Sequence, residues 1–221
     1  MNRFNVACGD SSVAERLAFP LGEGGAIPTS PLHVREIDFV AAKRLVVQYH
    51  YLGDTRFLHS RRFGLYSGGE LVGAAIFGNL SAPETAQSAF ALPRGNYPAL
   101  LELHRFVMAP SHNNSGNAGS FLLGHALRTL KKERYRAVIS YADAQHHVGY
   151  LYQATNFTYH GLTAPKCDYF VEGKKHSRGS VKGLSGEWRP RSRKHRYVYL
   201  FDKSLPVSWE KAPYPKLKNF Q

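Results

Sequence analysis

The sequence predicts a single α/β domain built on one mixed sheet. The chain has 221 residues, and 43% of them are hydrophobic, as expected for a protein with a packed core. Runs typical of strands alternate with runs typical of helices, and Gly68 and Gly69 form a tight-turn signal between two of the strand runs. The order of these runs favours a largely antiparallel first half and a parallel strand pair in the middle.

The first half of the chain divides into an arm and several expected elements. Residues 1–31 are rich in Gly, Pro and Ser and predict an irregular N-terminal arm. Asp38 is well placed as an N-cap, because a helix-type run begins directly after it. The expected elements are a strand at 32–37, a helix at 39–49, hairpin strands at 62–66 and 70–77, a loop at 79–98 and a strand at 100–108.

The second half continues the alternation of helices and strands. Its expected elements are a loop at 110–117, a helix at 119–134, a strand at 137–141, a helix at 144–155, and strands at 157–161 and 197–201. The folded domain therefore spans residues 32–205. A basic insertion occupies 173–196 within it, and residues 206–221 form a C-terminal tail.

The chain is strongly basic, and much of this charge lies in one segment. There are 29 Lys and Arg against 16 Asp and Glu, a formal net charge of +13. Such chains are attracted to polyanions, because neutralised phosphates release condensed counterions. The basic insertion holds one acid, Glu187, and an interleaved Trp188 on which a base could stack. Its cations are Lys174, Lys175, Arg178, Lys182, Arg189, Arg191, Arg193, Lys194 and Arg196.

A run of this kind is typical either of a solvated segment or of a segment that follows a nucleic-acid backbone. Its richness in arginine and its place inside the domain, before a final strand, favour a loop that tracks double-stranded DNA.

Composition also limits the location of the protein. The longest apolar runs, such as 71–77, are too short to span a bilayer, and the N-terminal arm lacks the pattern of a secretory signal. Cys8 and Cys167 are too few for a disulfide framework or a zinc cluster. These observations predict a protein of the reducing cytoplasm without a membrane partner.

A Gly-rich stretch lies between an expected strand and an expected helix. Backbone N–H groups at such a helix start favour a phosphate or a carboxylate, although Asn and Gly also make ordinary turns. The candidate ligand-binding residues are Asn113, Gly116, Ala118, Gly119 and Ser120.

Asp143 stands between an expected strand and an expected helix. It can serve as a helix N-cap, which is the commoner role, or accept a proton or hold a metal beside His147. Of the following Tyr150 and Tyr152, one is expected in the core and the other is expected to present its hydroxyl.

Three aromatic rings follow one another at the end of the first expected helix, and they cannot all point inward. His50 can make a favourable contact with the helix dipole. Because Tyr49 and Tyr51 flank it, the segment is also suited to hold a base that has flipped out of a duplex.

Arg105 lies in an otherwise apolar part of the strand at 100–108. It either pairs with a carboxylate, such as Glu102 or Glu70, or anchors an anionic substrate.

The order of elements and two of these motifs resemble the GCN5-related N-acetyltransferase (GNAT) fold. That family holds the acyl-CoA pyrophosphate on a loop of pattern Gln/Arg-x-x-Gly-x-Gly/Ala, which residues 113–118 match except at Asn113. Residues 149–157 are similar to a family segment that ends in Tyr-x-x-x-Gly-Phe, with Asn156 in place of the glycine. Both departures argue against ordinary CoA-dependent acetyl transfer.

A second resemblance covers about residues 49–201. The segments 49–52, 103–107, 120–122, 140–143 and 152–157 are similar to the phage Mom proteins. Those proteins share the acetyltransferase-like fold and convert adenine in phage DNA to N6-carbamoylmethyladenine, which blocks host restriction enzymes. The resemblance implies that the active site lies at or near His50, Tyr51, Arg105, Ser120, Tyr141, Asp143 and Tyr152.

The implied reaction assigns roles to these residues. Adenine N6 lies in the base stack, so the base has to be extruded, at a cost of a few kcal/mol. Tyr49, Tyr51 and Tyr141 are candidates for the base pocket. Asp143 is the candidate base for the N6 proton, with His147 in reserve.

The donor and any metal are less closely defined. Arg105 or the Gly116 loop would hold the anionic or carbonyl end of the donor. The donor's identity stays open, with an acyl-CoA-like molecule as one candidate. His50 and Asp143 could alternatively bind iron or another divalent metal, since imidazole and carboxylate suit such ions.

Two other functions stay open at this stage. One is a conventional acyl-CoA-dependent N-acetyltransferase acting on a small amine or a protein, with the basic segment serving only solubility. The other is a non-catalytic DNA-binding protein whose donor loop has decayed. The oligomeric state is also open, and a homodimer is one arrangement of this fold.

Overall fold

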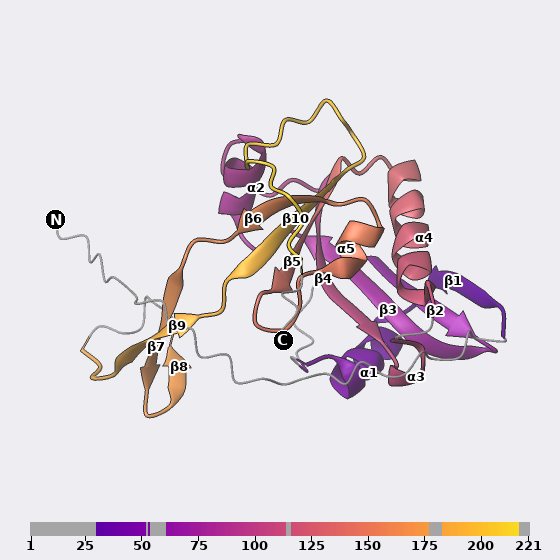
Figure 1. Ribbon diagram of the computed structural model, residues 1–221, viewed down its shortest axis with the longest axis horizontal. Coiled ribbons are helices and arrows are strands. Elements are labelled where there is room, and N and C mark those ends of the chain that lie inside the picture. Colours follow the sequence, from indigo (N-terminus) through magenta and orange to yellow (C-terminus); the bar gives the residue numbers. More distant parts are fainter. Residues whose placement is uncertain (1–29, 52, 54–60, 114–115, 177–182, 217–221) are drawn as a thin grey trace.

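The computed structural model describes residues 30–51, 53, 61–113, 116–176 and 183–216. Seven strands form one mixed sheet in the order β1-β2-β3-β4-β5-β10-β6 (Figure 1). A second sheet, with the order β8-β7-β9, projects from the body of the molecule beyond the ends of β6 and β10 (Figure 1). The α/β fold with one mixed sheet is thus confirmed, and a small sheet is added to it.

The elements have the following bounds. The main sheet contains β1 (Leu32–Glu36), β2 (Arg61–Ser67), β3 (Glu70–Asn79), β4 (Leu100–Met108), β5 (Ala137–Asp143), β6 (Thr158–Leu162) and β10 (Lys194–Leu200). The small sheet contains β7 (Lys166–Val171), β8 (Lys174–His176) and β9 (Glu187–Arg191). The helices are α1 (Phe39–Tyr49), α2 (Pro83–Phe90), α3 (Pro110–Asn113), α4 (Ala118–Lys132) and α5 (Tyr150–Ala154).

Two local predictions are confirmed in the first half of the chain. The Asp38 side chain caps α1 by accepting a hydrogen bond from the Ala41 backbone N–H at 2.8 Å. Gly68 and Gly69 both have positive φ, 57° and 88°, and turn β2 into β3. The cap fixes where α1 begins, and therefore also where its far end meets the sheet.

Helices cover both faces of the main sheet. On one face α1 packs its Ala42 and Val46 against Ile76 of β3, and α2 packs on the same side nearer to β5. On the other face α4 and α5 pack on the large central core, with Leu122 against Phe77 within it. Because successive side chains of a strand point to opposite faces of the sheet, the strands contribute to two separate apolar layers, one on each face.

A bulge in β4 places the site-forming side chains. Ile76 lies opposite Arg105, whereas the next residue, Phe77, lies opposite Leu103, so His104 is an extra residue in β4. The bulge turns Arg105 toward the α1 face together with Ile76, because directly opposed residues share a face of the sheet.

The parallel pair in the middle is β4 with β5, as the sequence predicts. The two strands pair only from Leu100 with Ala137 to Leu103 with Ser140. Beyond that point β5 continues beside β10 alone, up to the pair of Asp143 with Lys194. A gap therefore opens between β4 and β5 at their carboxyl ends, and we call it the β4–β5 gap.

Several predicted elements were wrong. The expected loop at 79–98 contains α2, and that at 110–117 contains α3. The helix expected at 144–155 is only α5, because Gly149, at φ 81°, ends the preceding turn just before it. The last strand begins at Lys194 rather than at Tyr197.

The basic insertion at 173–196 is not a loop in its described part. It contributes β8 and β9 to the small sheet and the first residues of β10 to the main one. Charged residues alternate along these strands with aromatic ones, which hides the usual apolar periodicity of strands.

The segment after β10 lies against the domain. Trp209 contacts Tyr141 edge to face, with ring centroids 6.5 Å apart, and the Tyr214 hydroxyl donates to the Phe157 carbonyl at 2.7 Å. Within the described residues, no helix has both the length and the apolar character needed to cross a bilayer.

Candidate active site and basic sheet

The β4–β5 gap gathers side chains from four parts of the chain. His50 and Tyr51 follow the end of α1, Arg105 lies on β4, Asp143 ends β5, and His147 lies in the turn before α5. The charges of Arg105 and His147 act on His50, and those of Arg105 and Asp143 act on Tyr51. The structure therefore brings together five residues from parts of the chain that are distant in sequence.

The aromatic part of this cluster is a stack of rings. Tyr51 stacks on His50, with centroids 4.6 Å apart and planes 24° from parallel, and lies 4.7 Å from the ring of His146. Burial first, then the positive charge of Arg105 and the neighbouring His147, lowers the pKa of His50 to about 4. His50 is thus a neutral imidazole at neutral pH, whereas the Tyr51 side chain remains 48% exposed.

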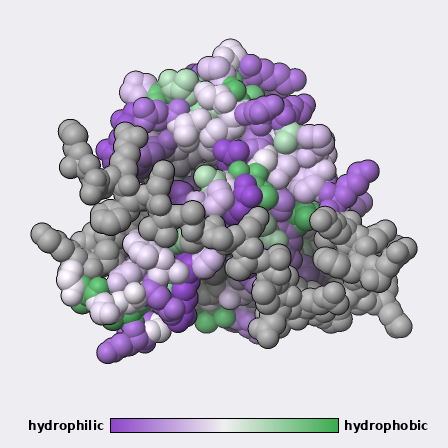
Figure 2. Space-filling model, turned by 60° about the vertical axis from the view of Figure 1, so that its left-hand side comes forward, coloured by the Kyte–Doolittle hydropathy of each residue, from purple (hydrophilic) through white to green (hydrophobic). Residues whose placement is uncertain are grey.

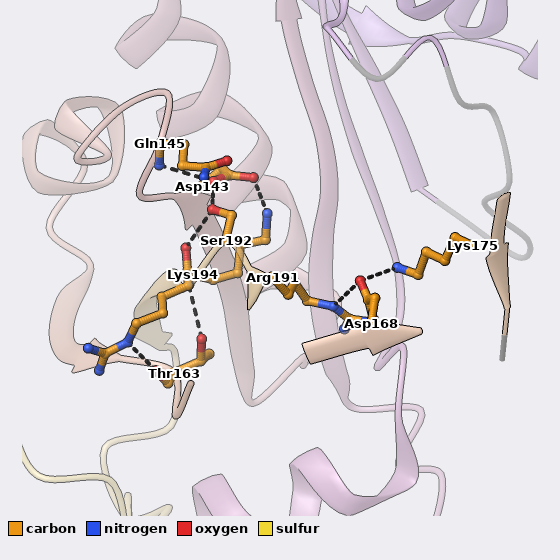
Figure 3. A network of polar contacts seen from close by, with 9 residues as sticks. Asp143, Gln145, Thr163, Asp168, Lys175, Arg191, Ser192 and Lys194 are labelled. Carbon is orange, nitrogen blue, oxygen red and sulfur yellow. Dashed lines mark hydrogen bonds and ion pairs between the residues drawn. The ribbon is translucent and has the colours of Figure 1, made fainter. Parts of the chain in front are cut away.

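Asp143 is held firmly at the end of β5. Its carboxylate accepts hydrogen bonds from the Ser192 hydroxyl and the Lys194 ammonium, and from the backbone N–H of Gln145 at 3.1 Å (Figure 3). Burial alone would raise the pKa of Asp143, but the contacts with Lys194 and Ser192 outweigh burial and lower it. Asp143 is therefore a stable carboxylate rather than a strong proton acceptor.

His147 is better placed to exchange a proton. Burial lowers its pKa, so the ring is neutral at neutral pH, while the negative charge of Asp143 acts in the opposite sense and favours the protonated form. The His147 backbone N–H also bonds the Asp143 carbonyl at 3.0 Å, which keeps the two residues together.

Arg105 and Glu102 do not form the pair that was one expectation for them. The Arg105 guanidinium donates to the backbone carbonyl of His104 at 2.7 Å. Glu102 accepts hydrogen bonds from the Ser81 backbone N–H at 2.9 Å and from the Ser81 hydroxyl at 2.8 Å. Its nearest base is His104, with 3.7 Å between a carboxylate oxygen and Nδ1.

The two tyrosines expected at the site occupy different environments. Burial, together with the charge of Glu102, raises the pKa of Tyr141 to about 12, and this ring packs against Trp209. Tyr152 is buried in the core beside Phe157, and burial raises its pKa as well. Tyr150, in contrast, is 55% exposed, so Tyr152 is the core member of that pair.

The expected donor loop leads into α4. Asn113 ends α3 and Gly116, at φ 52°, has open space around the position of a Cβ atom. Ala118 is a core residue, and the Ser120 hydroxyl donates to the Asn117 carbonyl at 3.0 Å. Gly119 packs near Phe106 of β4, so the start of α4 lies against the strand that borders the gap.

A metal held by His50 and Asp143 finds no support in the described part of the chain. There, no three His, Cys, Asp or Glu side chains converge as metal ligands. The Asp143 carboxylate is already engaged by Lys194 and Ser192.

The small sheet has two different faces, because directly opposed residues share a face. On one face Tyr169 lies opposite Trp188, their rings 5.0 Å apart, and the Tyr169 hydroxyl donates to the Leu184 carbonyl. We call the other face the charged face. It carries Lys166, Asp168, Phe170, Lys175, Glu187, Arg189 and Arg191.

Two acidic residues of the charged face, Asp168 and Glu187, form ion pairs with its cations. Asp168 accepts from Arg191 and lies 2.7 Å from the Lys175 ammonium, and the Arg191 contact first of all lowers the pKa of Asp168 to about 2. Arg189 pairs with Glu187 and lies over the ring of Phe170 at 4.7 Å. Figure 2 brings this side of the molecule forward, and its described surface is mostly hydrophilic, with hydrophobic residues in small separate groups.

Most of the predicted DNA-binding residues are distributed over three strands of two sheets. Lys174 and Lys175 lie on β8, Arg189 and Arg191 on β9, and Lys194 and Arg196 on β10, while Arg178 and Lys182 lie outside the described residues. Arg193 donates to the Thr163 carbonyl at 2.8 Å, and Arg196 lies over the Trp209 ring at 4.7 Å.

Sequence reasoning missed several residues at the site. His146, Ser192 and Thr163 contact or border the cluster, yet none of them was named as a site residue. The His146-His147 pair beside Asp143 was the only available signal for the first. Ser192 and Thr163 reach the site through strand register, which single-sequence patterns do not reveal.

The fold and the site together define the class of the protein. Solved structures that share the fold include an IAA acetyltransferase from Bacillus cereus, at 15% identity and a TM-score of 0.50 over 77% of this chain and 99% of that one. A spermidine N-acetyltransferase chimera from Vibrio cholerae and hSSAT also has 15% identity and a TM-score of 0.50, over 78% and 96%. The chain therefore has the GNAT acetyltransferase fold.

The family of the chain follows from its sequence profile. Residues 31–216 match the Mom protein family, and the chain belongs to that family. No curated protein matches the sequence.

Proposed function

We propose that this protein is a DNA-modifying transferase that converts adenine to N6-carbamoylmethyladenine and so protects phage DNA from host restriction. The observation that carries the proposal is the meeting of stacked rings, neutral imidazoles and a fixed carboxylate at the β4–β5 gap. This gap adjoins a basic sheet, since only residues 192 and 193 separate Arg191, at the end of β9, from Lys194, which pairs with Asp143 at the start of β10. Membership of the Mom family supports DNA as the substrate.

The stacked rings suit an extruded base. A flipped adenine needs an aromatic surface that replaces the stacking it loses, and the loss amounts to a few kcal/mol. Tyr51 is about half exposed and lies against the rings of His50 and His146, so the base would stack on the exposed part of this aromatic cluster. His50, whose pKa is lowered to about 4, is a neutral ring in this stack at neutral pH.

His147 would take the N6 proton, with Asp143 as a positioning residue. The N6 lone pair forms the new N–C bond, the electron pair of the donor's broken bond leaves with its leaving group, and the N6 proton passes to a ring nitrogen of His147. The nearby Asp143 carboxylate then stabilises the imidazolium that results. Lys194 and Ser192 keep Asp143 ionised for this purpose.

The donor would lie between the Gly116 loop and Arg105. The space around Gly116 is open, and the 15-residue helix α4 follows it, with backbone N–H groups at its start that suit a phosphate or a carboxylate. Arg105 on β4 would face the donor's carbonyl or anionic end across the gap. Such a site fits an acyl-CoA-like molecule, whose bound acyl or carbamoylmethyl carbon would then be presented to N6.

Mass spectrometry of nucleosides from cells that express the protein tests the proposal. We expect a carbamoylmethyladenine adduct with the wild-type chain and none with Asp143→Ala or His147→Gln. Asp202→Asn, which changes a partly exposed carboxylate paired with Arg136, is the control and should keep the adduct. Unmodified DNA from wild-type cells would instead favour a conventional N-acetyltransferase, which the fold also allows.

A further inference from the structure

A small cavity lies where the main sheet meets the small sheet. It has a volume of about 110 Å³ and is lined by Thr163, Ala164, Lys166, Arg191, Ser192 and Lys194. A water molecule occupies roughly 30 Å³ in the liquid, so the cavity has room for a group as large as phosphate. Three of its six lining side chains are cationic and two are hydroxylic, which is the donor set that a tetrahedral oxyanion requires.

The cations in this cavity lack full compensation among the described residues. Lys166 and Arg191 stand directly opposite each other on β7 and β9, and like charges in such pairs repel. Asp168 compensates Arg191 but shares its charge with Lys175, and Asp143 compensates Lys194 (Figure 3). No described carboxylate pairs with Lys166. A bound anion would therefore relieve a repulsion that is built into the sheet.

We propose that this cavity is a phosphate site and holds one backbone phosphate of the DNA next to the target base. The assignment rests on the proposed function, because the duplex supplies the phosphate. Lys194 and Ser192 line the cavity and also contact Asp143, so the bound phosphate lies one side chain away from the β4–β5 gap. The cavity would fix the position of the strand while the neighbouring adenine enters the gap. It is distinct from the loop at Gly116, which precedes α4.

Lys166→Ala is the variant that tests the site, because Lys166 is exposed and lines the cavity without a described ion pair. The matched control is Lys131→Ala, which removes an exposed lysine from the end of α4. Binding to a labelled duplex is followed by fluorescence anisotropy over a range of salt. With Lys166→Ala we expect weaker binding and a slope of log K against log salt that is shallower by about one. Lys131→Ala should keep the wild-type slope.

Single methylphosphonate linkages in the duplex identify the phosphate. Neutralising one linkage near the target adenine should weaken binding by the wild-type chain. The same change should not alter the affinity of Lys166→Ala, because the contact between Lys166 and that phosphate is already lost. If the variant and wild type lose affinity equally at every linkage, the assignment is overturned. The same follows if calorimetry shows that Lys166→Ala weakens the binding of coenzyme A, since the phosphate would then be the donor's.

These results separate the site from the proposed function. An adenine adduct together with equal losses at every linkage rejects the phosphate site and leaves the transferase proposal in place. If wild-type binding weakens at one linkage only, that of Lys166→Ala does not, and no adduct forms, the phosphate site is supported and the transferase proposal is rejected. A wild-type chain that binds no duplex at all overturns the site.

Discussion

Asp143 and Lys194 face each other across β5 and β10 at the end of the main sheet. The Asp143 side chain is 9% exposed and that of Lys194 is 35% exposed. Removing one partner of a buried pair is costly because the other charge stays buried without compensation. Lys194 can turn toward solvent, however, so the cost here falls below that of a fully buried pair.

Asp143→Asn should lower the free energy of unfolding by about 2 kcal/mol, as measured by urea denaturation. The pair of Asp202 and Arg136 provides the control, because both of its side chains are more exposed than Asp143. Asp202→Asn should cost less than about 1 kcal/mol. The reverse order of the two effects would show that Asp143 is not a structural partner of Lys194.

His50 should make the stability of the protein sensitive to acid. Its pKa is about 4 in the folded chain against 6.5 in the unfolded one, so the unfolded state binds the proton more readily. This contribution is fully present above pH 6.5 and is lost as the pH falls toward about 4. The free energy of unfolding of His50→Gln, measured across this range, should fall less steeply than that of the wild type. Equal slopes would place His50 in a solvated environment.

At the scale of elements, the sequence predicts those with a strong local signal. The α1 helix, the β2–β3 hairpin, β4 and α4 each have a cap, a turn or a clear period, and their bounds are close to those expected. The α2 helix was missed because its eight residues lie in a stretch with several prolines, although Pro83 at its start is itself a helix signal. Short helices give too few turns for a period to emerge.

The small sheet was missed for a different reason. Its strands have three to six residues, and Lys, Arg, Asp and aromatic residues share them, so neither face is apolar. The candidate site likewise contains residues that local sequence signals predict and residues that they do not. Family motifs pointed to His50, Tyr51, Arg105 and Asp143, which do come together, whereas the contacts of Ser192 depend on a register that pairs distant strands.

Gly186→Ala should disrupt the small sheet without unfolding the main one. A Cβ atom at Gly186 would lie 2.2 Å from the backbone oxygen of Phe170, so β9 could not keep its place beside β7. Trp188, one of only two tryptophans, would lose its contact with Tyr169, and its fluorescence should shift to the red. The main melting transition should change little, while duplex binding falls.

Gly95→Ala is the control for this variant. A Cβ atom there would meet Tyr97 at 3.5 Å, an ordinary contact, so fluorescence and duplex binding should stay as in the wild type. Unchanged fluorescence in Gly186→Ala would mean that the small sheet tolerates the displaced backbone.

At the scale of the whole molecule, the parts to which we assign DNA modification lie toward one end. In Figure 1, α1, α3 before the Gly116 loop, and the small sheet all lie toward the lower side of the view, whereas α2 and the segment after β10 lie toward the upper side. A duplex that contacts the charged face could therefore also reach the β4–β5 gap. On the proposed function, the net charge of +13 would attract DNA to the molecule as a whole, whereas local contacts would decide where it binds.

Salt dependence can separate these two effects of charge. The double variant Lys166→Ala with Arg189→Ala neutralises two cations of the charged face, neither of which is a described partner of Asp143 or Asp168. Lys131→Ala with Lys132→Ala removes two exposed lysines at the end of α4 and changes the net charge equally. Each phosphate contact adds about 0.9 to the slope of log K against log salt for duplex DNA.

The slope should therefore become shallower by about two in the small-sheet variant and stay near the wild-type value in the α4 variant. Anisotropy titrations with a labelled duplex at several salt concentrations give both slopes. Equal changes in the two variants would mean that net charge alone drives binding. The small sheet would then be no part of the DNA footprint, whatever the chemistry at the β4–β5 gap.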